Sequence, residues 1–117
     1  MVSKKELRPN HFYCDTWKMN YLYFIGWTSR AYEAYLLEVY ELRKDYTNAE
    51  GACLIMENDG HQATFLIWVR GRIDFASLAH EAVHAAVGTL ELRGYKYQGD
   101  DEALAYLTEA IFRRATL

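Results

Sequence analysis

The chain has 117 residues, of which 51% are hydrophobic and 15% aromatic, enough for one domain with its own core. An ordinary charged fraction of 25% excludes a disordered chain, and a net charge of −3 with scattered Lys and Arg argues against nucleic-acid binding. No apolar run is long enough to span a membrane, and residues 1–10 lack the apolar region of a signal peptide. We therefore expect a cytoplasmic protein, of bacterial or phage type, without a membrane or nucleic-acid partner.

Residues 1–10 are polar and predict a flexible arm, which leaves residues 11–117 as a single domain. The aromatic-rich segment that follows predicts a strand over residues 21–27. The chain before this strand either pairs back on it through Met19-Asn20 as a fourth strand or forms a loop. Cys14 and Cys53 are far apart in the sequence, and we expect two free thiols rather than a disulfide.

Residues 29–46 have apolar side chains at helical spacing, and Ser29 is the expected N-cap. The tyrosines of this helix, including Tyr32 and Tyr35, could form a binding surface, but a stripe at this spacing is more often a packing face. We therefore expect the tyrosine stripe to face the core.

Two strands are predicted over residues 52–57 and 61–69, joined by the tight-turn sequence Asn58-Asp59-Gly60. Both strands carry apolar residues at successive positions rather than in alternation. This pattern indicates a sheet covered on both faces, or else an edge strand, plausibly residues 61–69, on which a substrate peptide would lie.

A helix follows over residues 74–94, with Asp74 as N-cap and Gly94 as the residue that ends it. It contains His80-Glu81-Ala82-Val83-His84, in which two histidines four residues apart lie on the same helical face and can converge on one metal ion. Glu81 points to one side of this pair, from where it can act as general base towards a metal-activated water.

The alternative is a chance match, with both histidines hydrogen-bonded inside the core. The expected buried stripe of this helix, however, excludes both histidines, which favours a zinc site. The residues predicted for this stripe are Phe75, Leu78, Ala82, Ala86 and Leu90.

A catalytic zinc site takes three protein ligands, so a third ligand is needed beside His80 and His84. A final helix is expected from Asp100 or Asp101 to about Ala115, and Glu102 in its first turn can face the histidines if this helix packs back on the previous one. Glu91 is too distant along the helix, roughly 10 Å away.

Other candidates for the third ligand are weaker. His11 and His61 lie in distant segments, and buried thiols such as those expected here are usually inert. Asp101 is the fallback ligand. The acidic start of the helix could also serve only to complement the helix dipole.

The sequence H-E-A-V-H, followed by D-E-A-L-A-Y from Asp101 to Tyr106, resembles the gluzincin metallopeptidases, most closely their smallest members, the minigluzincins. The resemblance covers about residues 61–109. It implies His80, His84 and Glu102 as zinc ligands and Glu81 as general base. A metzincin pattern is absent, since no third histidine follows at the required spacing.

The chain departs from this family at two points. Tyr106 stands where larger gluzincins often have an Asp that supports the first histidine, a role that Glu109, Asp101 or a backbone carbonyl could take. The subdomain that carries a transition-state histidine in large members is also missing. Tyr95 is the first candidate for stabilising the oxyanion, ahead of the alternatives Tyr97 and His61, although Tyr95 could equally pack under a turn.

The expected fold is α+β, a minimal zincin-like domain with a three-stranded, possibly four-stranded, sheet on three helices in the order β-α-β-β-α-α. The expected function is zinc-dependent hydrolysis of peptide bonds in a peptide or protein substrate, with an undefined oligomeric state. The alternative is a catalytically silent protein of this fold that binds or regulates a partner protein. A zinc hydrolase acting on a non-peptide amide is a third possibility.

Overall fold

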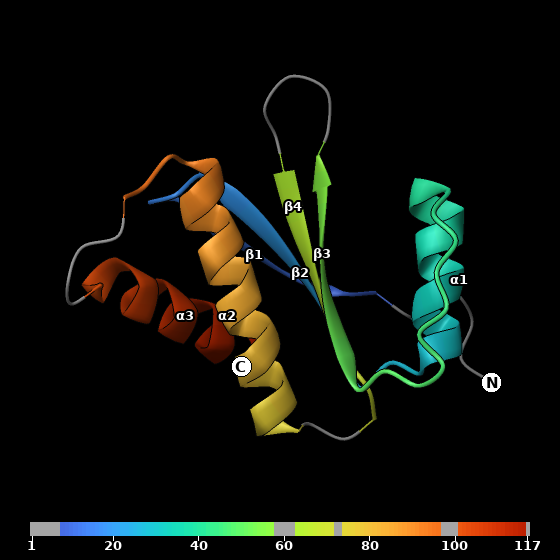
Figure 1. Ribbon diagram of the computed structural model, residues 1–117. Helices are drawn as coiled ribbons and strands as arrows, with labels where there is room; N and C mark the ends of the chain where they lie inside the picture. The colour runs from blue at the N-terminus through green and yellow to red at the C-terminus, as the bar shows by residue number, and fades with distance from the viewer. Residues whose placement is uncertain (1–7, 58–62, 72–73, 97–100, 117) are drawn as a thin grey trace.

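A computed structural model describes residues 8–57, 63–71, 74–96 and 101–116. It is an α+β fold with a mixed four-stranded sheet and three helices, in the order β-β-α-β-β-α-α (Figure 1). The α+β class is confirmed, and the segment before the second strand does form a strand. The elements are β1 (Asn10–Cys14), β2 (Met19–Ile25), α1 (Ser29–Tyr40), β3 (Gly51–Glu57), β4 (Ala63–Val69), α2 (Phe75–Leu92) and α3 (Glu102–Ala115).

The sheet has the strand order β1-β2-β4-β3, in which β2 and β4 are parallel and the other two pairs are antiparallel. The expectation that residues 61–69 form an exposed edge is therefore wrong: β4 is an internal strand, bonded to β2 on one side and to β3 on the other. Six of its seven side chains are buried, as is typical of a strand inside a sheet that is covered on both faces. The open edge on this side of the sheet is β3.

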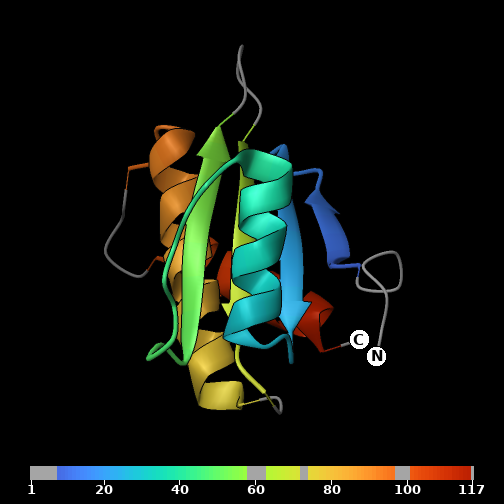
Figure 2. The same ribbon diagram turned by 90° about the vertical axis from the view of Figure 1, so that its right-hand side faces the viewer.

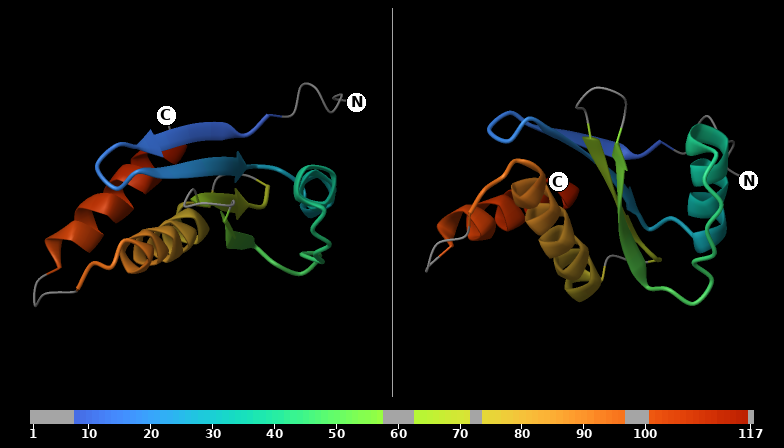
Figure 3. Two further views of the ribbon diagram at one scale, coloured as in Figure 1. Left: turned by 90° about the horizontal axis from the view of Figure 1, so that it is seen from above. Right: turned by 45° about the horizontal axis from the view of Figure 1, so that its top comes forward.

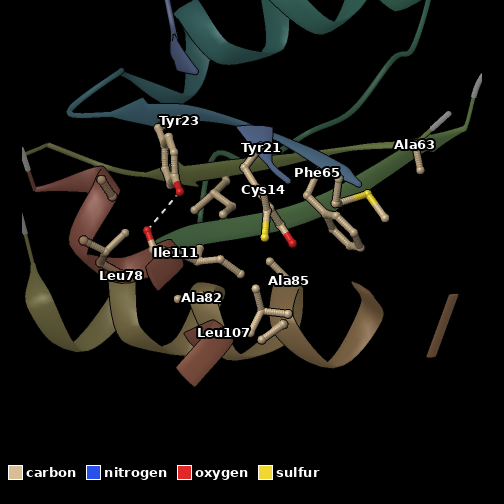
Figure 4. Close-up of a cluster of buried hydrophobic side chains, with 14 of the residues drawn as sticks. Cys14, Tyr21, Tyr23, Ala63, Phe65, Leu78, Ala82, Ala85, Leu107 and Ile111 are labelled. Carbon is tan, nitrogen blue, oxygen red and sulfur yellow. Dashed lines mark hydrogen bonds between the residues drawn. The ribbon is translucent and has the colours of Figure 1, made fainter. Parts of the chain in front are cut away.

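The sheet separates two hydrophobic layers, as its two-faced apolar pattern predicted. Helix α1 covers one face, and α2 with α3 covers the other (Figures 1 and 3). Side chains of β4 alternate between the layers: Phe65, Ile67 and Val69 pack under α2 and α3, whereas Leu66 and Trp68 pack under α1. Figure 4 shows the first layer, where the Tyr23 hydroxyl donates a 2.9 Å hydrogen bond to the backbone carbonyl of Ile111 in α3.

Helix α1 differs from its prediction at both ends. Thr28, not Ser29, is the N-cap, because its side chain accepts a hydrogen bond from the backbone N–H of Ala31. The helix ends at Tyr40 rather than at residue 46, because Glu41 adopts a left-handed conformation with φ of 56°. Residues after Glu41 return along the sheet, and Tyr46 packs against Trp68.

The α1 tyrosines face the core, as expected. Tyr32 is fully buried and stacks on Trp68, and Tyr35 packs against Phe24 and Trp27. The stripe is therefore a packing face in the structure.

The ends of α2 agree with the sequence. Asp74 caps it by accepting hydrogen bonds from the backbone N–H groups of Ala76 and Ser77, and Gly94 follows it with φ of +72°. Phe75 is the exception in the expected buried stripe, since 59% of it is exposed, and its ring lies against that of Phe112.

Several expectations concern the ends of the chain and its connections. Residues 1–7, the turn at 58–60 and Asp100 lie outside the described residues, while Asn10 already belongs to β1. Cys14 and Cys53 are free, as expected. Within the described parts of the chain, no helix has the length and apolar character that crossing a membrane requires.

Candidate metal centre

His80 and His84 lie on an exposed face of α2, one turn apart, off the buried stripe as predicted. Their Nε2 atoms are 3.1 Å apart, and their rings meet edge to face with an interplanar angle of 79°. Two imidazole nitrogens at this separation either share a proton or bind one cation between them.

The geometry of this pair fits Zn²⁺. With zinc–nitrogen bonds of about 2.0–2.1 Å and tetrahedral angles, two ligating nitrogens lie about 3.3 Å apart, close to the spacing in the structure. A carboxylate oxygen of Glu81 completes a three-residue group in which all donor atoms lie within 4.8 Å of one another. The two imidazole nitrogens are donors that zinc prefers, and Glu81 supplies a carboxylate that is near enough to act as a ligand or as a base, so the residues present fit this ion.

Glu81 differs from the two histidines because it points back under the sheet. Only 7% of the residue is exposed, although it is ionisable and makes no hydrogen bond within the described structure. Burial raises the pKa of its carboxyl group, and the neighbouring His80 and His84 oppose this by lowering the pKa. A raised pKa makes this carboxylate a stronger base than an exposed glutamate, and it lies beside the histidine pair.

Gly51, the first residue of β3, makes room for this carboxylate. A Cβ atom on Gly51 would lie 3.1 Å from Oε2 of Glu81 and 2.8 Å from the backbone oxygen of Trp68. The Glu81 carboxylate therefore lies directly against the backbone of the open edge strand.

A cavity of about 500 Å³ opens beside the metal group, between the beginning of α2 and the beginning of β3. Figure 2 shows β3 at the side of the sheet with α2 behind it, both running in the same direction. The lining residues are Ala49, Glu50, Gly51, Ala76, Ser77, His80 and Glu81. A molecule in this cavity would touch both the first histidine and the proposed base.

Glu102 is not brought to the histidines. It is exposed in the first turn of α3, and its carboxylate is outside the donor group that His80, Glu81 and His84 form among the described residues. Asp101, the fallback ligand, is the N-cap of α3 and accepts a hydrogen bond from the backbone N–H of Leu104. Helix α3 packs on α2 as expected, with Leu107 and Ile111 buried in the interface.

The structure does not bring Tyr95 to the site either. It follows the far end of α2, where its ring packs edge-on against Trp17, and it does not line the cavity beside His80. The alternatives His61 and Tyr97 lie outside the described residues. His11 is on β1, at the opposite edge of the sheet, and its ring bonds to Asn20.

The carboxylate expected to support a ligand histidine is also absent among the residues that the structure describes. Glu109 bonds to Arg113 on its own helix, and Tyr106 is 67% exposed on the outside of α3. The residue that the sequence analysis missed is Gly51. In the sequence, Gly51 is only a glycine that precedes an apolar run, and this position is typical of a turn.

Comparison with known proteins gives no relative: no family model, no curated protein and no solved structure matches this chain.

Proposed function

We propose that the protein is a zinc-dependent peptidase. The observation that carries the proposal is the convergence of His80, Glu81 and His84 on one point, with Glu81 held between α2 and the open edge of the sheet. The resemblance to gluzincins in the motif supplies the reaction class. When bound there, Zn²⁺ would act as a Lewis acid that polarises a carbonyl oxygen and activates water.

The residues have separate roles in this proposal. His80 and His84 would hold the ion. The resemblance implies Glu102 as the third ligand, although its carboxylate lies outside the donor group in the structure. Glu81 would accept a proton from the attacking water through its carboxylate and then donate that proton to the leaving amine. Burial of Glu81, which raises its pKa, supports the first of these transfers because the group gains a proton more readily.

The substrate would bind along β3. Among the strands that the structure describes, β3 pairs only with β4, so the backbone groups on its other side are available to an extended peptide. A peptide added there would pass Gly51, against which the Glu81 carboxylate lies. The absent side chain at Gly51 lets the peptide backbone and the base approach each other.

The test is hydrolysis of a peptide mixture by the zinc-loaded protein, compared with its Glu81→Gln variant. Glu81→Gln is expected to keep zinc and to lose at least a hundredfold in rate, the lower range for removal of a general base. Cleavage at the rate of the wild type by Glu81→Gln would refute the mechanism. Val83→Ala is a matched control, because Val83 is an exposed residue of the same helix outside the metal group.

The second candidate is a zinc-containing or metal-free protein that binds a partner without turnover. The position of Glu102 favours it, because two histidines alone do not make a complete catalytic site. In that case, partner binding would survive Glu81→Gln, whereas hydrolysis would be absent from the wild type as well.

A further inference from the structure

We infer that the cavity beside His80 takes a basic side chain, so that a peptide bound on β3 is cut on the N-terminal side of Lys or Arg. The inference rests on the proposed function and adds the substrate class to it. It is carried by the shape of the cavity, by its charge and by the direction of β3 relative to α2.

The shape leaves room for a long side chain. The cavity has a volume of about 500 Å³, and its walls near β3 and at the start of α2 are small residues, Ala49, Gly51 and Ala76. A volume of this size is in the range of binding pockets for small molecules. A Lys or Arg side chain would enter past His80, keep its methylene groups against the alanines and present its charge to the polar part of the lining.

The charge of the lining selects the cation. Among the residues that the structure describes, the cavity walls carry two carboxylates, Glu50 and Glu81, and neither Lys nor Arg. Glu50 is exposed and makes no hydrogen bond or ion pair with described residues through its side chain. Arg70, whose backbone N–H donates to the Glu50 carbonyl, uses its guanidinium to donate hydrogen bonds to the carbonyls of Tyr46 and Thr47. Glu50 is therefore available to pair with an incoming ammonium or guanidinium group.

The direction of β3 relative to α2 determines whether this side chain lies before or after the scissile bond of the peptide. Helix α2 and β3 run the same way (Figure 2). The residues that line the cavity come from the beginning of both elements and lie before His84 in α2. A peptide that adds to β3 in the more stable antiparallel register runs from the Glu57 end towards the Gly51 end. The residue after the scissile bond then reaches the cavity.

The first experiment maps cleavage sites in a mixture of peptides by mass spectrometry, using the zinc-loaded wild type, Glu50→Gln and Glu50→Lys. The wild type is expected to prefer Lys or Arg after the cut by about fivefold over Gln, the upper range for a partly exposed ion pair. Glu50→Gln should lose this preference, and Glu50→Lys should reverse it towards acidic residues. Glu57→Gln, which removes an exposed charge at the other end of β3, should leave it unchanged.

The second experiment does not depend on turnover. Arginine amide is titrated into the protein, and NMR shifts of the backbone amides of Ala49, Gly51 and Ala76 are followed in the wild type, Glu50→Gln and Glu57→Gln. The dissociation constant is expected to rise about fivefold in Glu50→Gln and to stay constant in Glu57→Gln. Shifts at these amides that are insensitive to Glu50→Gln, or no shifts there at all, would overturn the inference.

The two experiments separate the two levels of the proposal. Binding of arginine amide that depends on Glu50, without cleavage of any peptide, would support the basic pocket and refute the peptidase. Cleavage with a site preference that ignores Glu50 would support the peptidase and refute the pocket. No cleavage and no binding would refute both.

Discussion

Gly51 and Glu81 are thirty residues apart in the sequence, yet a Cβ atom on Gly51 would lie 3.1 Å from a carboxylate oxygen of Glu81. The edge strand and the motif helix therefore meet at a position where only hydrogen fits. This contact fixes the proposed base relative to the strand on which a substrate would bind.

Gly51→Ala is expected to destabilise the protein by about 1–3 kcal/mol, because the new methyl group would also meet the Trp68 carbonyl at 2.8 Å. In a Glu81→Ala background the cost should be smaller by about 0.5 kcal/mol or more, because one of the two close contacts is gone. Urea denaturation of the four proteins measures this coupling. Strictly additive costs would show that Gly51 makes room for the strand backbone alone.

Two variants, each lacking one carboxylate, distinguish which glutamate is the third zinc ligand. If Glu102 is the third ligand, Glu102→Ala should weaken zinc binding at least tenfold and Glu81→Gln should leave it nearly unchanged, as measured by competition with a chelator. The opposite pattern, with zinc affinity lost in Glu81→Gln and kept in Glu102→Ala, would assign Glu81 as a ligand. That result would contradict its role as base.

The N-cap of α1 gives a matched pair of adjacent hydroxyl residues. Thr28→Ala removes the side-chain acceptor for the Ala31 N–H and should cost about 1 kcal/mol, whereas Ser29→Ala inside the helix should cost no more than a few tenths. Thermal or urea unfolding compares them. Equal effects would mean that the helix begins one residue later than the structure has it.

Cys53 should be protected from thiol reagents. Burial raises the pKa of its thiol to about 12, and the Glu81 carboxylate adds to this. In a Cys14→Ser variant at pH 8, labelling of Cys53 should be on the order of a hundredfold slower in the folded than in the unfolded protein. Equal rates would place the thiol in solvent.

The pH dependence of this group has a defined sign. Since the folded pKa lies above the unfolded value of about 8.5, the contribution of Cys53 to stability is fully present below pH 8.5. It is lost as the pH rises towards about 12. If the Cys53 thiol instead increased the free energy of unfolding as the pH rises over this range, the raised pKa would be contradicted.

The sequence predicted the element types well because its periodicities are strong. Asp74 and Gly94 delimit α2 by local chemistry, so both could be read from the chain. Thr28 was missed because the neighbouring Ser29 is a residue type that is preferred over Thr at the N-cap. The end of α1 depends on the left-handed conformation of Glu41. Glutamate has no preference for this conformation, so the sequence does not predict it.

Long-range placement was harder to predict than local structure. The motif predicted the convergence of His80, Glu81 and His84 because three residues on one helix need only helical geometry. Sequence spacing allowed Glu102 to reach the same point, but its position depends on how α3 crosses α2, which no local pattern encodes. The edge position of β3 likewise follows from a parallel pairing between β2 and β4 that is remote in sequence.

The most direct test of the metal centre is the zinc content of the purified protein, measured by elemental analysis for the wild type, His84→Ala and His11→Ala. His11→Ala is the control, because His11 lies on β1, outside the metal group. We expect one zinc per chain in the wild type and in His11→Ala, and none in His84→Ala. No zinc in the wild type after incubation with excess metal, or equal zinc in His84→Ala, would contradict it.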